Sequence, residues 1–256
     1  MRFLLRLVFF ATLSCTAAHA QVAELSGGFV HMGYSATDED IPVSQLPLYL
    51  DELEDLRYDT IIITPTRVTK SGRTCATSAS DFEWVKGFPS KLGTILNEAA
   101  ARNMKVIVGT TYTNMRCASF WGSGNTAAVE ADAALSYASL AATYGSHPAF
   151  LGWYIPDEPG PVPASTHNYY SRVTAKLKAA MPGKPVMVAP YLGSPSTSPS
   201  SLALAARSFR DATGVDVQIW QDGIGANPNA KLFFWTRSGY SIDQYYQALG
   251  SQLGKV

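Results

Sequence analysis

The sequence predicts an α/β protein, a (β/α) barrel of the TIM type. Short apolar runs alternate with segments of helical spacing, which indicates strand-helix-strand crossover units and a parallel sheet. The runs are apolar at successive positions, as is typical of strands covered on both faces. No glycine-rich phosphate loop follows the first run, because residues 33–37 lack the G-x-G-x-x-G spacing of a dinucleotide-binding turn. We therefore favour a barrel over an open, doubly wound sheet.

Seven runs are predicted as strands, and six segments between them as helices. The strands are residues 28–34, 60–64, 105–110, 150–155, 185–190, 215–220 and 231–235. The helices are residues 44–56, 90–103, 126–144, 165–181, 200–213 and 242–253. Ser90 and Asn125 are placed to cap helix starts, and Gly145 and Gly214 to end helices. No clear eighth strand follows, so the barrel is expected to be incomplete or to close with a short strand in residues 238–242.

Residues 1–20 have the pattern of a secretory signal peptide. Two arginines precede the apolar residues 7–13, and the small-x-small sequence Ala18-His19-Ala20 resembles a cleavage site. The apolar run is too short to span a membrane. Lipid attachment at Cys15 is the less favoured alternative, since Thr12 stands where such a site prefers leucine. We expect a secreted or periplasmic protein.

Charge and cysteine content narrow the partners of the remaining domain, residues 21–256. The chain has 20 basic and 20 acidic residues, and residues 1–20 contain two arginines and no acid, which leaves 18 against 20 and a net charge of −2. This composition predicts no nucleic-acid or anionic-membrane partner. Export favours a disulfide between Cys75 and Cys117, with two unpaired thiols as the alternative. We expect a monomer without cofactor. No metal site is expected either, because the remaining histidines have no metal-binding spacing: His31, His147 and His167.

The stretch Gly152–Pro159, with the sequence GWYIPDEP, is the main candidate for chemistry. An apolar, aromatic run stops at Pro156, and the carboxylates Asp157 and Glu158 follow immediately. Loops at the carboxyl ends of parallel strands carry the functional side chains of such folds. Glu158 is therefore the first candidate catalytic residue. A solvated, proline-rich loop is the alternative interpretation.

Alternation along the strands tests which side chains face the barrel interior. Glu158 shares a face with Gly152 and Tyr154, whereas Trp153 is expected to pack under the helices. In the sixth run, Asp222 is expected to point into the barrel mouth with Trp220. By the same alternation, the side chains of Gln218 and Asp216 are expected inside the barrel, and those of Val217 and Ile219 against the helices.

Two carboxylates at one edge of the barrel suit the hydrolysis of a glycosidic bond. One carboxylic acid protonates the leaving oxygen, and another carboxylate acts on the anomeric carbon directly or through water. Glu158 and Asp222 are the predicted catalytic pair. Asp222 is followed by Gly223, and an ordinary turn aspartate is the alternative.

The loops at the same edge contain aromatic and polar side chains that can bind sugar. Flat rings stack on the apolar faces of pyranose units, while polar neighbours bind the hydroxyl groups. The predicted substrate-binding residues are Tyr34, Arg67, Tyr112, Trp121, Tyr154, Asp157, Tyr191, Trp220 and Gln221, with Asn114 as a further ligand. The alternative is that these rings only pack, and that Arg67 and Asn114 are ordinary surface and turn residues.

Three motifs resemble those of the bacterial domain of unknown function 4434 family. They are GWYIPDEP, VMVAPY (residues 186–191) and QDGIG (residues 221–225), and the similarity extends from Ser26 to Gly225. The resemblance implies a glycoside-hydrolase-like TIM barrel, secreted and active on carbohydrate, with Glu158 and Asp222 at the matching positions. It implies no particular substrate.

Residues 231–236 contain no carboxylate, although related barrels commonly place one at the seventh strand. Two functions therefore remain open. The first is a glycoside hydrolase acting on an extracellular or cell-wall polysaccharide, with Glu158 as general acid/base and Asp222 as nucleophile or base. The second is a non-catalytic glycan-binding barrel.

Overall fold

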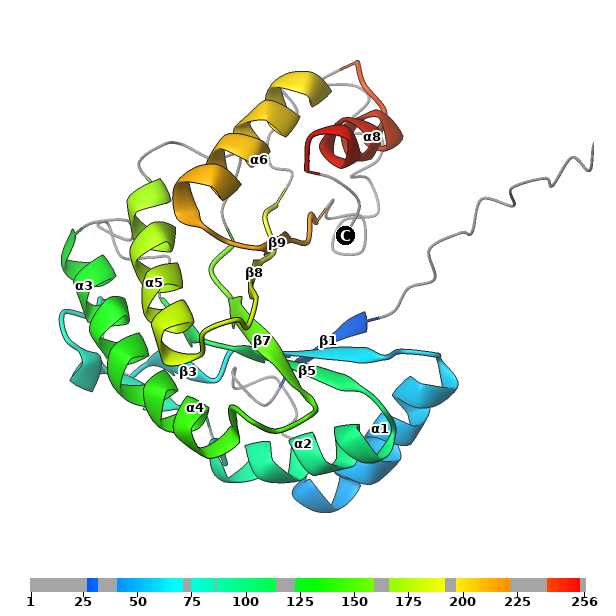
Figure 1. The fold of residues 1–256 in the computed structure, drawn as a ribbon, viewed down its shortest axis with the longest axis vertical. Helices are drawn as coiled ribbons and strands as arrows, with labels where there is room; N and C mark the ends of the chain where they lie inside the picture. Colours follow the sequence, from blue (N-terminus) through cyan, green and yellow to red (C-terminus); the bar gives the residue numbers. More distant parts are fainter. Residues whose placement is uncertain are drawn as a thin grey trace, which may run out of the picture.

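Six parallel strands form one curled sheet in the computed structural model (Figure 1). The structure describes residues 27–31, 41–70, 75–85, 87–113, 123–158, 166–191, 197–221 and 239–253. The strands are β1 (Gly27–His31), β2 (Thr60–Thr64), β5 (Lys105–Gly109), β7 (Phe150–Ile155), β8 (Val186–Val188) and β9 (Val217–Gln218). Their order across the sheet is their order along the chain. A doubly wound sheet would reverse this order at a switch point, so the predicted barrel type is confirmed.

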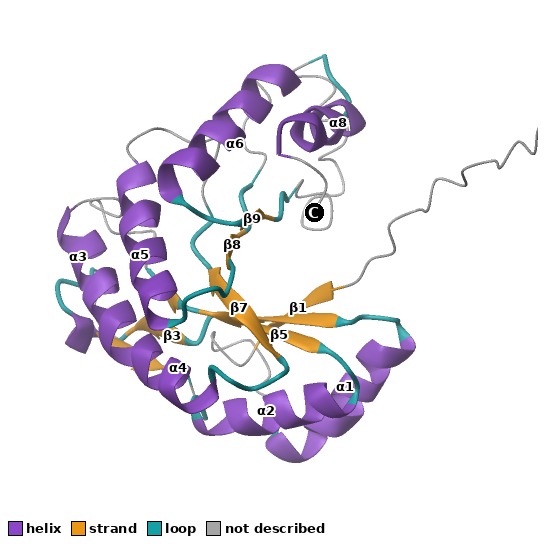
Figure 2. Ribbon diagram, in the orientation of Figure 1, coloured by secondary structure: helices purple, strands orange, loops and turns teal. Residues whose placement is uncertain are grey.

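The helices lie on the convex side of this sheet (Figure 2). They are α1 (Leu46–Asp55), α2 (Ser90–Ala101), α3 (Ser123–Asp132), α4 (Ala138–Tyr144), α5 (His167–Ala180), α6 (Pro199–Thr213) and α8 (Ile242–Leu253). A π-helical turn, Ala133–Tyr137, joins α3 to α4, and single 3-10 turns form at Val43–Gln45 and Ala79–Asp81. Every predicted helix is present. Gly214 ends α6 in the left-handed conformation (φ 71°), whereas Ser90 and Asn125 lie within helices and do not cap them.

Side chains on the two faces of the sheet form two separate apolar clusters. The outer cluster lies between strands and helices and includes Ile61, Ile63, Val108 and the fully buried Trp153. The inner cluster lies on the concave face and contains Ile62, Ile107, Tyr154, Met187 and Ala189. Trp153 and Tyr154 therefore point to opposite faces, as their alternation predicts.

A second, three-stranded sheet, called here the rim sheet, extends beyond the carboxyl edge of β2 and β5. It consists of β3 (Arg67–Thr69), β4 (Phe82–Trp84) and β6 (Thr111–Tyr112), in the order β4-β3-β6. β3 follows β2 after Pro65 and Thr66, and β6 follows β5 after Thr110. The sequence did not predict this sheet, because its strands have only two or three residues.

The predicted faces of the sixth strand are wrong. Val217 and Ile219 pack against the inner cluster, whereas Trp220 packs on the outside with residues of α6 and α8. The Gln218 side chain also points outward, where its Nε2 donates to the carbonyl of Ala206 at 3.0 Å. The prediction assumed that only the outer face is apolar. The inner face is apolar as well, and the surface of α6 and α8 accommodates the large indole.

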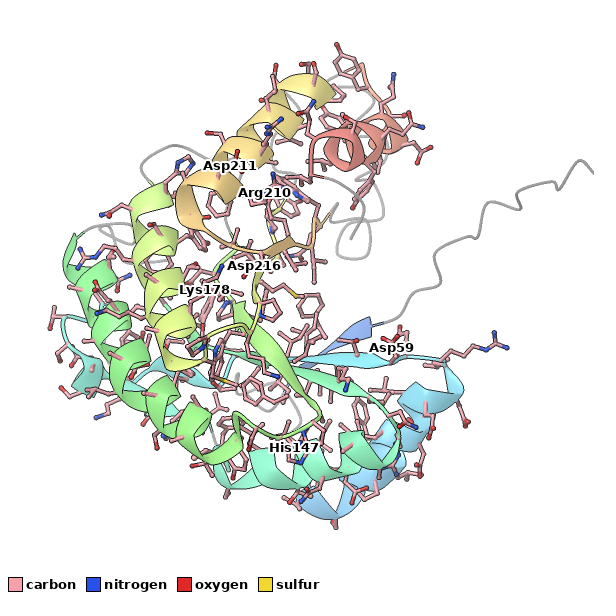
Figure 3. The ribbon with its side chains drawn as sticks, viewed as in Figure 1. Asp59, His147, Lys178, Arg210, Asp211 and Asp216 are labelled. Atoms are coloured by element: carbon pink, nitrogen blue, oxygen red, sulfur yellow. The ribbon has the colours of Figure 1, made fainter. Side chains whose placement is uncertain are left out.

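At the amino edge of the sheet, Asp216 joins three segments (Figure 3). One carboxylate oxygen pairs with Lys178 Nζ of α5 at 2.8 Å, and the other accepts the backbone N–H of Val186 at 2.8 Å. The start of β8 is thereby tied to the segment before β9.

The sixth strand is the last one in the part of the chain that the structure describes, so the described strands form an incomplete, curled barrel. The predicted seventh strand, residues 231–235, lies outside the described residues. Residues 239–241 contain no strand. Within the described ranges, no helix is long and apolar enough to cross a membrane.

We expect Gly152→Ala to destabilise the fold by about 1–3 kcal/mol, because a Cβ at this position would lie 2.4 Å from the carbonyl oxygen of Pro185 and force strands β7 and β8 apart. Gly250→Ala is the matched control, since an added Cβ in α8 meets nothing within 4 Å and should stabilise the helix by up to about 1 kcal/mol. Urea unfolding of both variants measures the difference. Equal effects would contradict the close contact.

Candidate active site

Glu158 lies at the carboxyl edge of β7, three positions after the last strand residue, Ile155, and its side chain is exposed. Pro156 interrupts the strand, because proline has no N–H to donate to a continuing ladder. β7 has neighbours on both sides, β5 and β8, so Glu158 stands over the middle of the sheet.

The Glu158 carboxylate is held by an amide from the sixth strand. Gln221 Nε2 donates to Glu158 Oε1 at 3.1 Å and to the carbonyl oxygen of Ala189 at 3.0 Å. The Gln221 backbone N–H donates to Pro190 O at 2.9 Å, and Gln221 forms a parallel bridge with Tyr191. The ends of the fourth and sixth strands therefore meet at one site, although a fifth strand lies between them.

Asp157 is fully buried, and its carboxylate has partners from two other elements. Its Oδ1 accepts the backbone N–H and the hydroxyl of Thr113 at 3.1 and 3.0 Å, and Tyr169 of α5 donates to Oδ2. The Tyr170 hydroxyl donates to the carbonyl of Asp157 at 2.7 Å. The prediction that Asp157 contacts substrate is wrong for this structure, because an enclosed and fully bonded carboxylate has no surface left for a sugar.

Burial raises the pKa of Asp157 to about 7, from an ordinary value of 3.8. The hydrogen bonds from Tyr169 and Thr113 favour the charged form and oppose this rise, and the negative charge of Glu158 adds to it. Asp157 is therefore half neutral near pH 7.

Tyr154 lies on the concave face below Glu158. Its ring is 3% exposed and packs edge-on against Phe29 of β1, with 5.4 Å between ring centroids. Burial, followed by the charges of Glu158 and Asp157, raises the pKa of Tyr154, so its hydroxyl group stays protonated. Phe29 is 39% exposed. Sequence reasoning missed Phe29, although its alternation with Val30 is the signal that could have placed it on the concave face.

Arg67 is buried and holds the rim sheet to helix α3. Its Nε donates to Asp132 Oδ2 at 2.9 Å, and its Nη2 lies 2.8 Å from Asp132 Oδ1 and donates to Phe82 O at 3.1 Å. The guanidinium also stacks on Trp84, 4.6 Å from the ring centroid. The structure does not favour the prediction that Arg67 binds sugar, because the side chain is buried and its Nε and Nη2 are engaged inside the protein. Spacing could not reveal Asp132 as the partner, because it lies 65 residues away.

The remaining predicted ligands divide into three groups. Tyr191 is 40% exposed at the end of β8 beside Gln221, and Tyr112 is half-buried in the rim sheet. Trp220 lies on the outer side and not on the face predicted for a sugar platform. The others lie outside the described residues: Tyr34, Asn114 and Trp121. The predicted catalytic residue Asp222 also lies outside them. Cys117 also lies outside them, so the disulfide with Cys75 stays a prediction.

His147 and His167 have local packing partners. His147 Nε2 lies 3.2 Å from Asn97 Oδ1, and the His167 ring meets Phe209 edge-on at 5.6 Å. Among the residues that the structure describes, no cluster of three His, Cys, Asp or Glu side chains could hold a metal ion.

A curled parallel sheet with strand order equal to chain order and helices on its outer side defines an incomplete (β/α) barrel of the TIM type. Residues 25–249 match the family described as "Domain of unknown function (DUF4434)", and the chain belongs to this family. No curated protein matches the chain significantly.

Solved structures share this fold at low sequence identity. A candidate alpha-L-fucosidase from Bacteroides thetaiotaomicron is 15% identical with a TM-score of 0.62, over 91% of this chain and 85% of that one. A beta-galactosidase from the psychrophilic Marinomonas ef1 is 10% identical with a TM-score of 0.50, over 76% of this chain and only 40% of that one. Identities this low establish the fold alone.

We expect Arg67→Ala to destabilise the protein by about 3 kcal/mol or more, because it leaves the buried Asp132 carboxylate without its cation. Arg207→Ala removes an exposed arginine of α6 and should change the free energy of unfolding by less than about 0.5 kcal/mol. Chemical denaturation measures both. A folded Arg67→Ala variant of unchanged stability would contradict the buried ion pair and favour a role for Arg67 at the surface.

We expect Asp157→Asn to change how stability depends on pH. The folded-state pKa of about 7 exceeds the unfolded value of 3.8, so the folded protein holds the proton more tightly. The contribution of this bound proton to stability is complete below pH 4 and is lost as pH rises to 7, by about 1.4 kcal/mol per pH unit. The asparagine variant lacks this contribution, because it has no proton to lose.

Denaturant unfolding from pH 4 to pH 8 compares the wild type with Asp157→Asn. Asp211→Asn, which changes an exposed aspartate of α6 (Figure 3), should keep the wild-type slope. Parallel curves for wild type and Asp157→Asn would show that the buried carboxyl group does not titrate in this range.

Proposed function

We propose that the protein is a glycoside hydrolase acting on an extracellular or cell-wall polysaccharide, with Glu158 as general acid/base. The observation that supports this proposal is the environment of Glu158. Its carboxylate is exposed at the carboxyl edge of the barrel and oriented by Gln221, and the adjacent Asp157 is fixed inside the protein. An accessible carboxylic acid in a fixed position is what proton donation to a glycosidic oxygen requires.

The second carboxylate of the proposed reaction is Asp222. It follows Gln221 directly in the chain, and Gln221 contacts Glu158. If Asp222 attacks the anomeric carbon itself, the two carboxyl groups should be about 5–5.5 Å apart and the product retains its configuration. If it activates water, about 6.5–9.5 Å is expected, with inversion.

Exposed and half-buried rings near Glu158 give the proposed substrate a surface to stack on. Tyr191 and Phe29 are 40% and 39% exposed; Phe29 lies in β1, and Tyr191 follows β8 and bridges to Gln221, which contacts Glu158. Pyranose rings present apolar C–H faces to such side chains. The proposal also includes export by residues 1–20, which would place the enzyme with extracellular or wall glycans.

The test is the release of reducing ends from bacterial exopolysaccharides and wall glycans by the purified protein. Glu158→Gln keeps the shape of the side chain but cannot donate a proton, so we expect activity to fall by about 100-fold or more. Glu52→Gln, an exposed glutamate of α1, is the control and should retain full activity.

A direct binding measurement on the same glycans separates the two functions that the sequence left open. If neither wild type nor Glu158→Gln releases sugar while both bind one glycan, the protein is a binding barrel and the catalytic proposal is refuted. If Glu158→Gln hydrolyses as fast as wild type, another group is the acid.

A further inference from the structure

We infer that Gln221 is a positioning residue that determines which oxygen of Glu158 carries the catalytic proton. The inference rests on the proposed function and goes beyond it, because it assigns different roles to the two carboxyl oxygens. It gives the amide nitrogen of Gln221 a role within the protein, since this nitrogen already has two protein acceptors.

The orientation of the Gln221 amide follows from its other partner. The carbonyl oxygen of Ala189 can only accept a hydrogen bond, so the group 3.0 Å from it must be the NH₂ of Gln221. The second hydrogen of this NH₂ is then directed to Glu158 Oε1, 3.1 Å away. Because an N–H cannot accept, Oε1 acts as the acceptor in this bond. The carbonyl oxygen of a neutral carboxyl group is a better acceptor than its hydroxyl oxygen, so the bond favours the acid proton on Oε2.

Both partners are anchored, so the carboxyl oxygen that faces Gln221 stays within hydrogen-bond distance of its amide. Gln221 is held by its backbone bond to Pro190 and its bridge to Tyr191. The backbone before Glu158 is held by Asp157, which is bonded to Thr113, Tyr169 and Tyr170.

The hydrogen bond also has a use during the reaction. As the proton moves from Oε2 to the glycosidic oxygen, the bond from that oxygen to the anomeric carbon breaks and its electron pair stays on the leaving oxygen. The anomeric carbon receives an oxygen from water or from the second carboxylate. Glu158 becomes an anion, and a bond from an N–H to a carboxylate is stronger than one to a neutral carboxyl group. Gln221 would therefore stabilise charge that develops in the transition state.

The kinetic test uses Gln221→Met, which keeps the length of the side chain and removes its N–H groups. On oligosaccharides, whose leaving group needs a proton, we expect kcat/KM to fall by about 10- to 100-fold. On dinitrophenyl glycosides, whose leaving group departs without protonation, the fall should be at most a few-fold. Equal losses on both substrates would mean that Gln221 is only structural and would overturn the inference.

Gln218→Met is the matched control. It removes the same amide three residues away, where Nε2 donates to Ala206 on the outer side of the sheet. We expect no dependence of its effect on the leaving group.

A second measurement does not need activity. The side-chain amide ¹H and ¹⁵N resonances of Gln221 should titrate with the same midpoint as the ¹³C carboxyl resonance of Glu158, and this titration should vanish in Glu158→Gln. The Gln218 amide should not follow it. If the Gln221 amide resonances do not change as Glu158 ionises, the inference is refuted, even in an active enzyme. A coupled titration in a protein that hydrolyses no glycan refutes the proposed function and leaves the Gln221 assignment in place.

Discussion

The burial of both faces of β7 is the constraint on which the rest of the structure depends. Trp153 occupies the outer side without any exposed surface, and Tyr154 fills the inner side. Gly152 precedes these two residues. Because it has no side chain, the carbonyl of Pro185 can approach closely enough for β8 to pair with β7. A strand covered on both faces can offer functional side chains only at its ends. Pro156 sets that end, and the polar groups that follow have to be satisfied by side chains from elsewhere in the chain.

One short segment satisfies two buried carboxylates, Asp132 and Asp157. Thr111 donates its hydroxyl to Asp132, and Thr113 donates its hydroxyl and backbone N–H to Asp157. Residues two apart on an extended segment point to the same side, so the end of β6 contacts both acids at once. Asp132 is neutralised by Arg67, whereas the donors to the Asp157 carboxylate, Thr113 and Tyr169, are neutral. A buried carboxylate without a cation is costly, which explains why burial raises the pKa of Asp157. The Arg67–Asp132 ion pair thus connects the rim sheet to α3, and Asp157 connects the end of β6 to α5 through Thr113 and Tyr169.

Much of the fold could be predicted from the sequence, because periodicity and strand order are properties of neighbouring residues. The six described strands, the helices, and the opposite faces of Trp153 and Tyr154 all follow from local patterns. The side-chain environments did not. Arg67 and Asp157 are polar residues that we predicted at the surface, but both are buried. Arg67 pairs with Asp132, 65 residues away, and Asp157 is bonded to Thr113, 44 residues away. Trp220 shows the same limit, since an apolar pattern cannot tell which of two apolar faces a large side chain will occupy. The sequence indicates Glu158 and Gln221 as site residues, but it does not indicate the hydrogen bond between them, because they are 63 residues apart.

The adjacent acids Asp157 and Glu158 show how position alone can give two identical chemical groups different tasks. One is enclosed by α5 and the end of β6, and the other is exposed above the sheet. With a pKa of about 7, Asp157 is mostly neutral in mildly acidic solution. In that range, the negative charge that Glu158 gains on giving up its proton meets no second charge on its neighbour in the chain. Above pH 7 Asp157 ionises, and the two carboxylates then repel each other. The buried acid can therefore hold the backbone of the site without opposing proton transfer by its neighbour, provided that the solution is not alkaline.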